Sequence, residues 1–358
     1  MKKWKKIIGA VAGIMIVLAT VFVYQREKAA LHFVERMGNG INLGNSLDAT
    51  NLKEFNQEKN ELDYEISWHN PPIDKKTFEA IHEAGLNTVR IPVTWEEHMD
   101  ADGNISEVWM NRVQEVVDMA LAEDLYVIIN THHEEWLDLH PDQETEMTER
   151  LRKVWLQIAE RFEEYDEKLI FEGMNEPRLR GSEHEWDGGT LEMQQMVNRL
   201  NHAFVQAVRS AGGENTDRYL MISTCASVSF KEALETLEVP EGHIIVSVHA
   251  YLPYNFCQNE EGTAQWDRNN PEDTREIEEA FETMESLFVK KDVPVILSEF
   301  GCKDKGNQKD RVEWLKFHME LAEKYGICCL WWDNGSSYQL LDRTTGEWTN
   351  PELVELLR

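Results

Sequence analysis

The chain is poor in cysteine, with five in 358 residues, and none of their spacings matches the paired ligands of a structural zinc site. This scarcity excludes a small scaffold held together by many disulfides. The sequence does not exclude one disulfide bridge among the five cysteines. Cys328 and Cys329 are neighbours in an apolar run, so we expect them on opposite faces of a strand.

Basic residues are also scarce. The chain has 36 lysines and arginines against 66 aspartates and glutamates, for a net charge of −30. Residues 31–358 alone carry −35, because six basic residues and one acidic residue lie within the first 30. A body this acidic repels phosphate backbones, which excludes nucleic acid as a partner. We interpret the charge as a solvated surface that keeps an exported protein soluble, and we expect a monomer.

No linker rich in proline, serine or threonine interrupts the chain after residue 30, and no long segment repeats. We therefore expect one domain over residues 30–358, a length that suits one large barrel. A glycine-rich phosphate loop after the first strand is missing as well. Gly38-Asn39-Gly40 precedes that strand instead, which disfavours a doubly wound nucleotide-binding sheet.

The first 29 residues differ from the rest. Four lysines precede residues 7–23, an apolar run, and a bulky charged flank follows at residues 24–28. The pattern predicts a secretory signal, but the run approaches the length of a membrane span and no small-residue cleavage site follows it. Residues 1–29 are therefore either a signal peptide or an N-terminal membrane anchor. In both cases the protein is secreted or extracellular, and in the second it stays on the cell surface.

Short apolar runs alternate with longer helical patterns along the body. We predict eight strands, and several are continuous apolar runs, as expected for parallel strands buried on both faces. They span residues 40–43, 88–93, 126–130, 169–174, 218–223, 244–248, 293–298 and 328–332. The segments between them keep apolar residues on one helical face, and Pro71 to Asp74 opens a helix that ends at Gly85. Eight such units predict a (β/α)₈ TIM barrel.

Active sites of such barrels lie at the carboxyl ends of the strands. Polar, ionisable and aromatic residues gather there in this chain: Asn42, Asn45, Asp48, Arg90, Asn130, His132, His133, Glu134, Asn175, Glu176, His249, Tyr251, Glu299, Trp331, Trp332, Asp333 and Asn334. Two of them, Glu176 and Glu299, are carboxylates at the ends of separate buried strands. A pair of this kind can break a glycosidic bond, with one residue as proton donor and the other as nucleophile.

Seven motifs in this order resemble glycoside hydrolase family 5, and within it the subfamily 4 endo-β-glucanases. The resemblance covers roughly residues 36–350. The motifs begin at Gly40 (GINLGNSLD), Asn87 (NTVRIPVTW), Asn130 (NTHHE), Asn175 (NEP), His249 (HAY), Ser298 (SEFG) and Trp331 (WWDNG). Asn-Glu-Pro alone would be a weak match, whereas all seven together are a strong one.

The resemblance implies a retaining double displacement in one catalytic domain, with no cofactor and no metal. Glu176 would be the acid/base, and Glu299 the nucleophile that forms a glycosyl-enzyme ester. Arg90 and the Tyr251 hydroxyl would keep Glu299 ionised. The remaining residues assigned to substrate binding are Asn45, His132, His133, Asn175, His249, Trp332, Trp68 and Trp136.

Within this set, Asn175 would bond the sugar 2-OH and Trp332 would be the platform under the sugar. His132 and His133 also raise the question of a metal. Adjacent residues of a strand point to opposite faces, so we expect that one site does not use both.

Other aromatic residues are candidates for the cleft wall: Trp68, Trp95, Trp136, Trp266, Tyr338 and Trp348. We expect Trp68, Trp136 and Trp266 at sugar subsites. The chain departs from the subfamily pattern at His69, where glycine usually follows the tryptophan, and this puts the subsite geometry in doubt.

The resulting hypothesis is an endo-β-1,4-glucanase acting on cellulose, mixed-linkage glucan and also xyloglucan. The same mechanism on mannan or xylan is one alternative. A surface glycan-binding protein without turnover is another, although binding alone needs neither glutamate. The sequence leaves open the preferred glucan, the tolerance of side chains and the cleavage of the N-terminal segment.

Overall fold

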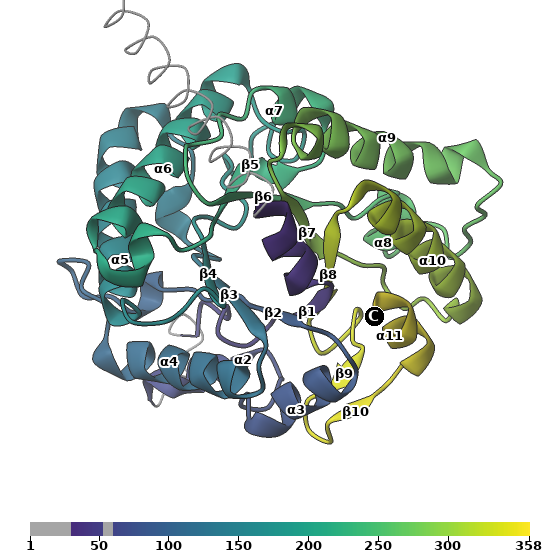
Figure 1. Ribbon diagram of the computed structural model, residues 1–358, viewed down its shortest axis with the longest axis horizontal. Helices are drawn as coiled ribbons and strands as arrows, with labels where there is room; N and C mark the ends of the chain where they lie inside the picture. Colours follow the sequence, from purple (N-terminus) through teal and green to yellow (C-terminus); the bar gives the residue numbers. More distant parts are fainter. Residues whose placement is uncertain (1–29, 53–59) are drawn as a thin grey trace, which may run out of the picture.

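The computed structural model describes residues 30–52 and 60–358, and eight parallel strands form a closed barrel within them (Figure 1). Each strand pairs with the next in the sequence, and β8 closes the barrel against β1. The strands are β1 (Gly40–Leu43), β2 (Thr88–Ile91), β3 (Tyr126–Asn130), β4 (Leu169–Glu172), β5 (Leu220–Val228), β6 (Ile244–His249), β7 (Val295–Phe300) and β8 (Cys328–Asp333). The predicted TIM barrel is confirmed.

The strand boundaries differ from the predicted ones by a few residues. β7 begins at Val295, because Pro294 has no backbone N–H to donate to the sheet. β5 runs on to Val228, but its register against β6 shifts between Ser223 and Val228. Ala226 and Ser227 lie in that shifted part with φ of 54° and 52°. The left-handed region is costly for residues other than glycine, so this bend is a strained feature at the carboxyl end of the barrel.

Helices surround the barrel (Figure 1). They are α2 (Tyr64–Ser67), α3 (Lys75–Glu83), α4 (Glu107–Ala122), α5 (Glu144–Arg161), α6 (Leu191–Ser210), α7 (Lys231–Glu235), α8 (Tyr254–Cys257), α9 (Pro271–Leu287), α10 (Gln308–Tyr325) and α11 (Pro351–Leu357). The helix predicted after Pro71 is α3. The side chain of Asp74 caps it by accepting the Thr77 N–H, and Gly85 follows its end with φ of 80°. A small hairpin of β9 (Leu341–Asp342) and β10 (Glu347–Trp348) follows β8.

Residues 30–37 form a further helix that covers the amino-terminal end of the barrel (Figure 1). Its buried residues Phe33, Val34 and Met37 belong to one apolar cluster with strand residues that include Ile128 and Leu330. A second and much larger cluster lies between the strands and the outer helices. Successive residues of one strand fall in different clusters, as the alternation of side chains requires.

The alternation places a polar layer inside the barrel above the apolar one. In β4, Ile170 belongs to the apolar cluster, and Glu172, two residues on, points into the same interior nearer the carboxyl end. The same step occurs in β3, β6 and β7, where Ile128, Ile245 and Ile296 of the apolar cluster lie two residues before Asn130, Ser247 and Ser298. The buried layer consists of Asn42, Arg90, Asn130, Glu172, Ser247 and Ser298. The floor of the strand-end site is therefore a set of hydrogen-bonding groups rather than hydrocarbon.

The predicted signal or anchor at residues 1–29 lies outside the described residues. Within the described part, no helix is long and apolar enough to cross a membrane. All five cysteines are described and none is bridged. Cys328 is half-buried and Cys329 fully buried, on the opposite faces expected of β8.

Candidate active site

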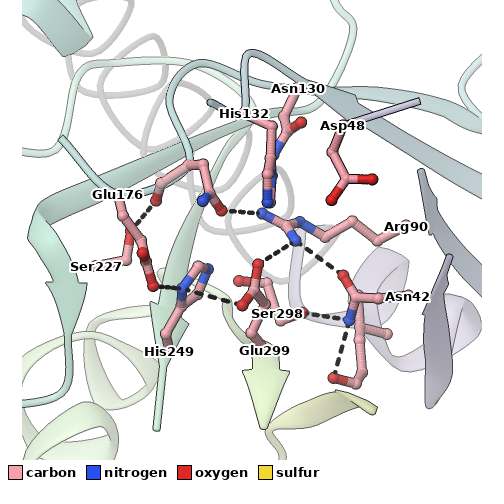
Figure 2. A network of polar contacts seen from close by, with 12 residues as sticks. Asn42, Asp48, Arg90, Asn130, His132, Glu176, Ser227, His249, Ser298 and Glu299 are labelled. Atoms are coloured by element: carbon pink, nitrogen blue, oxygen red, sulfur yellow. Dashed lines mark hydrogen bonds and ion pairs between the residues drawn. The ribbon is translucent and has the colours of Figure 1, made fainter. Parts of the chain in front are cut away.

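Arg90 of β2 lies at the centre of the site and is fully buried (Figure 2). Its Nη1 donates to Glu299 Oε1 at 2.6 Å and to Asn42 Oδ1 at 2.8 Å. Its Nη2 donates to Asn175 Oδ1 at 2.7 Å, and its Nε to Glu172 Oε2 at 2.7 Å. Burial works against the charge of Arg90, but Glu172 and Glu299 outweigh it, so the pKa of Arg90 is raised. The guanidinium is therefore a fixed cation with four oriented partners.

Glu299, in β7, receives two donors. Besides Arg90, the Tyr251 hydroxyl donates to Glu299 Oε2 at 2.9 Å, and His249 Nδ1 lies 3.6 Å from the same oxygen. Burial raises the pKa of Glu299 above its ordinary value, and the charges of His249 and Arg90 offset part of that rise. The carboxyl is 5% exposed at the base of the cleft, where a reacting atom can reach it.

Glu176 follows β4 and faces Glu299 from the opposite side of His249 (Figure 2). His249 Nδ1 lies 2.9 Å from Glu176 Oε1, and Arg178 Nη1 lies 3.5 Å from Oε2. Burial favours the neutral carboxyl, but the bond to His249 outweighs it and lowers the pKa of Glu176. One nitrogen of His249 and one oxygen of each glutamate lie within 4.8 Å of one another. The side chains of both predicted catalytic residues therefore lie next to His249.

The strained end of β5 holds the turn that carries Glu176. The Ser227 hydroxyl donates to the carbonyl oxygen of Asn175, and the Ala226 N–H donates to that of Pro177 at 2.8 Å. Both residues on the β5 side have positive φ. The strain therefore positions donors on either side of the acid/base candidate, in keeping with the concentration of strained backbone at functional sites.

A second cluster lies beside the pair. Asp48, His132 and His133 each place a ligand atom within 4.8 Å of the others, so they could hold a metal ion. The expectation that His132 and His133 do not share one site is wrong. They follow the end of β3 at Asn130, where the pleat that separates neighbouring side chains has ended. Burial lowers the pKa of both imidazoles, so both are neutral at pH 7.

Trp332 and Trp68 lie around this cluster. The Trp332 ring stacks against His132 with centroids 5.8 Å apart, and Trp68 lies 5.7 Å from His133. Gly44 is required here, because a Cβ at this position would lie 2.5 Å from the Trp332 ring. Trp331 is fully buried in the barrel wall. Asn45 is half-buried at the end of β1, and its N–H donates to Asp48 at 3.0 Å.

The remaining aromatic candidates differ in how far their side chains are buried. Trp136 is half-buried, and its indole N–H donates to Glu134 at 2.8 Å. The placement of Trp266 at a sugar subsite is wrong. Its side chain is buried against Phe317, and its N–H bonds to the carbonyl of Asp273 at the start of α9. Trp95 and Tyr338 are buried as well.

Sequence reasoning missed an aromatic pocket on the Glu176 side of the cleft. A cavity of about 550 Å³ is lined by Glu176, His249 and Tyr251, and by three exposed aromatic residues, Trp186, Phe230 and Tyr254. Arg178 lies 4.1 Å from the Trp186 ring and also contacts Glu176, so it ties this wall to the catalytic turn. The three aromatics lie outside the strand-end motifs, in the segments that follow β4, β5 and β6. Only Trp186 lies in a long segment, between β4 and α6, and that position was the available signal.

Comparisons with known proteins show which proteins this chain resembles. The profile of the family described as Cellulase (glycosyl hydrolase family 5) matches residues 48–337. Endoglucanase 1 of Ruminococcus albus is 44% identical over 341 residues, which cover 92% of this chain and 81% of that protein.

Two solved structures share the fold closely. One is a GH5-4 broad specificity endoglucanase from Ruminococcus champanellensis with bound cellotriose, 38% identical with a TM-score of 0.87, covering 91% of this chain and 97% of that one. The other is XEG5A, a xyloglucan-specific endo-β-1,4-glucanase from a metagenomic library in complex with cellotriose. It is 37% identical with a TM-score of 0.84, and the match covers 89% of this chain and 95% of that one.

Proposed function

The chain belongs to glycosyl hydrolase family 5 as a subfamily 4-like endoglucanase, and from that premise we propose that it hydrolyses β-1,4-linked glucans with retention of configuration. Cellulose, mixed-linkage glucan and xyloglucan are the proposed substrates. One observation carries the proposal. Oxygens of Glu176 and Glu299 lie within 4.8 Å of each other, on either side of His249. Retaining enzymes hold their carboxyl groups about 5–5.5 Å apart, whereas inverting enzymes need about 6.5–9.5 Å to admit a water.

In the first step, Glu299 attacks the anomeric carbon and the bond to the leaving oxygen breaks. Arg90 and Tyr251 donate to the two oxygens of Glu299 and so aim the ionised carboxylate. Glu176 donates its proton to the leaving oxygen. In the second step, the ionised Glu176 takes a proton from water, which attacks the anomeric carbon and releases Glu299.

His249 supplies a source for the proton that Glu176 must donate. The two glutamates raise the pKa of His249 despite its burial, and we assign the one transferable proton of the trio of Glu176, His249 and Glu299 to the imidazole. Transfer along the 2.9 Å bond from Nδ1 to Oε1 gives a neutral His249 and a protonated Glu176. The net charge of the trio is unchanged by this transfer, so its cost inside the buried site is small.

The aromatic pocket supports action within a chain rather than at its end. A proton donor lies on the leaving-group side of the cleaved bond, so the cavity beside Glu176 would receive the reducing-end portion of the glucan. Sugar rings present C–H groups to flat aromatic faces, which Trp186, Phe230 and Tyr254 offer there. Trp332 would bind the ring on the other side of the bond.

Proton NMR during early hydrolysis tests the stereochemistry. The purified protein is mixed with cello-oligosaccharide, and spectra are taken before mutarotation blurs the signal. We expect the β-anomer to form first. An initial α-anomer would overturn the retaining mechanism and the role of Glu299 with it.

A panel of soluble polysaccharides tests the substrate. Carboxymethyl cellulose, mixed-linkage glucan and xyloglucan should be cut with a rapid fall in viscosity, because internal cuts shorten chains fastest. Glucomannan and xylan are the comparison substrates. Faster cleavage of either comparison substrate than of every glucan would place the enzyme on a mannan or xylan backbone. A lack of turnover on all five, with retained binding, would indicate a glycan-binding protein.

Location and assembly are also proposals. We propose an exported monomer, held at the cell surface if residues 7–23 are retained as an anchor.

A further inference from the structure

Glu172 is a third carboxylate of the site, and the proposed reaction does not use it. It lies in β4, four residues before Glu176, and is fully buried in the polar layer of the barrel. Its Oε2 accepts from Arg90 Nε at 2.7 Å and from Asn130 Nδ2 at 2.9 Å, and its Oε1 accepts from the Ser247 hydroxyl at 2.5 Å. Each carboxylate oxygen of Glu172 thus accepts from a donor inside the barrel, and none of these hydrogen bonds is made in the cleft.

Arg90 is shared between two buried carboxylates. Glu172 contacts Nε at 2.7 Å, and Glu299 contacts Nη1 at 2.6 Å, so the two lie on different edges of one guanidinium. A dedicated arginine would pull the pKa of a carboxylate down. Because Glu172 lies against the same guanidinium, its negative charge offsets part of the field of Arg90 at Glu299. Burial raises the pKa of Glu299 above its ordinary value. The nucleophile is therefore more basic than a single arginine partner would leave it.

The groups that face Glu299 come from four places. They are Arg90 from β2, His249 from β6, Tyr251 from the segment after β6, and Glu176 from the turn after β4. Glu172 makes no hydrogen bond to Glu299. It acts on Glu299 through Arg90, and through the Ser247 and Ser298 hydroxyls, which lie 2.6 Å apart. Ser298 immediately precedes Glu299, so this second route ends at its backbone. On the Arg90 side, His132 from the segment after β3 adds no charge because it is neutral.

We propose that Glu172 is a positioning residue for the nucleophile. It holds Arg90 in place from inside the barrel and offsets part of the positive charge of Arg90, which keeps Glu299 a reactive nucleophile. This rests on the proposed function, because it requires Glu299 to attack the sugar. A less basic carboxylate attacks more slowly, but it is a better leaving group from the glycosyl-enzyme ester. Loss of the Glu172 charge should therefore slow the first step and not the second.

Glu172→Gln tests this with little change of shape. The amide oxygen still accepts a hydrogen bond, but the negative charge is gone. Glu299 is then the only carboxylate bound to Arg90. We expect the acid limb of the kcat/KM profile to move to lower pH by about one unit, because Glu299 now stays ionised further into acid. On an aryl cellobioside with a good leaving group, kcat/KM should fall about tenfold, while kcat, set by the second step, should hold or rise.

Glu65→Gln is the matched control. Glu65 is also a buried carboxylate bound to an arginine: it accepts from Arg112 Nε at 2.9 Å and Nη2 at 2.7 Å, between α2 and α4. It has no bond to Arg90 or Glu299. Both variants should lose thermal stability, because each breaks a buried ion pair. Only Glu172→Gln should move the acid limb or separate kcat from kcat/KM.

Two outcomes would overturn the proposal. One is an equal loss of kcat and kcat/KM in Glu172→Gln with an unmoved acid limb, as expected of a purely structural residue. The other applies if Glu172→Gln does not fold. Ser247→Ala then removes one hydrogen-bond donor to Glu172, so the Glu172 carboxylate interacts more strongly with Arg90. Arg90 then stabilises the ionised form of Glu299 less, and the acid limb should move to higher pH. An unmoved limb in that variant would also refute the role of Glu172.

The failure of the proposed function would look different. In that case the unaltered enzyme would form no ester on Glu299 with a 2-deoxy-2-fluoro cellobioside. If the ester forms and the Glu172→Gln profile does not move, the proposed function stands and only the role of Glu172 fails.

Discussion

His249 Nδ1 lies 2.9 Å from Glu176 Oε1, so the proposed proton donor is hydrogen-bonded to an imidazole. The same nitrogen is 3.6 Å from Glu299 Oε2. One ring thus stands between acid and nucleophile, and the ionisation of the three groups is a property of the trio.

The pH dependence of kcat/KM follows from this trio. Glu299 must be ionised, and its pKa is raised above the ordinary 4.5, so activity should fall as pH drops below a limb that lies above 4.5. The trio must also keep its single proton. The pKa of His249 is raised above the ordinary 6.5, so activity should fall as pH rises through a limb above 6.5. A pH–rate series on cello-oligosaccharide measures both limbs. A basic limb below pH 6 would contradict the storage of the proton on His249.

Glu176→Ala should separate substrates by their leaving group. Natural glucans need a proton on the departing oxygen, so turnover should fall about a thousandfold or more. Aryl glycosides with good leaving groups need little protonation and should still form the ester at a near-normal rate. Added azide should then release a β-glycosyl azide, detectable by mass spectrometry. Equal loss on both substrates without azide rescue would argue that another residue is the acid.

The proximity of the two proposed catalytic residues could be predicted from the sequence because two physical rules act together. Parallel barrel strands are apolar runs, and the residues that end them share one rim, so Glu176 and Glu299 had to lie on the same side of the barrel. Glu172 was not singled out because it lies inside a strand. Only the alternation of β4, read together with a known inward-facing neighbour such as Ile170, would place it under Arg90.

The errors and omissions have equally local causes. His132 and His133 were separated by a rule that holds within a strand, yet they lie just beyond the end of β3. Trp266 carries no periodicity that distinguishes a cleft wall from a helix–helix contact, and it packs near α10. Trp186 lies in the segment between β4 and α6, where long-range folding rather than local pattern decides which side chains meet the cleft.

The N-terminal segment can be tested directly on the native protein. If residues 7–23 are an anchor, the protein from cells should carry residues 1–29 and sediment with membranes until detergent is added. Mass spectrometry of the N-terminus decides the question. A protein that begins near Ala29 and is found only in the medium would rule out the anchor.

His69 stands where the subfamily usually has glycine, and its φ is 75°. That conformation is strained for a side-chain-bearing residue, so His69→Gly should raise the free energy of unfolding by about 0.5 kcal/mol. His82→Gly is the control, because His82 is an exposed residue inside α3. There glycine should lower the free energy of unfolding by about 0.3 kcal/mol, because histidine is itself a weaker helix former than alanine. Thermal or urea unfolding measures both. A loss of stability in both variants would show that the His69 side chain contributes more than its backbone costs.

Trp186→Ala should weaken the leaving-group side of the cleft without disturbing the chemistry. The side chain is 52% exposed, so the fold should lose little stability when it is removed. Loss of one stacking surface should lower kcat/KM on cellohexaose about fivefold to tenfold. An aryl cellobioside places only its aryl group beyond the cleaved bond, so its kcat should change little.

The comparison needs a matched variant and a product analysis. Val108→Ala removes another exposed apolar side chain, on α4 and away from the pocket, and should leave both substrates unaffected. Cleavage of cellohexaose in Trp186→Ala should also shift toward bonds that leave fewer sugars beside Glu176, because long leaving groups lose their advantage. If instead the aryl cellobioside slowed as much as cellohexaose, Trp186 would be acting on Glu176 through Arg178, which contacts both. That result would show that the pocket does not bind the substrate and that the Trp186–Arg178 pair positions Glu176 instead.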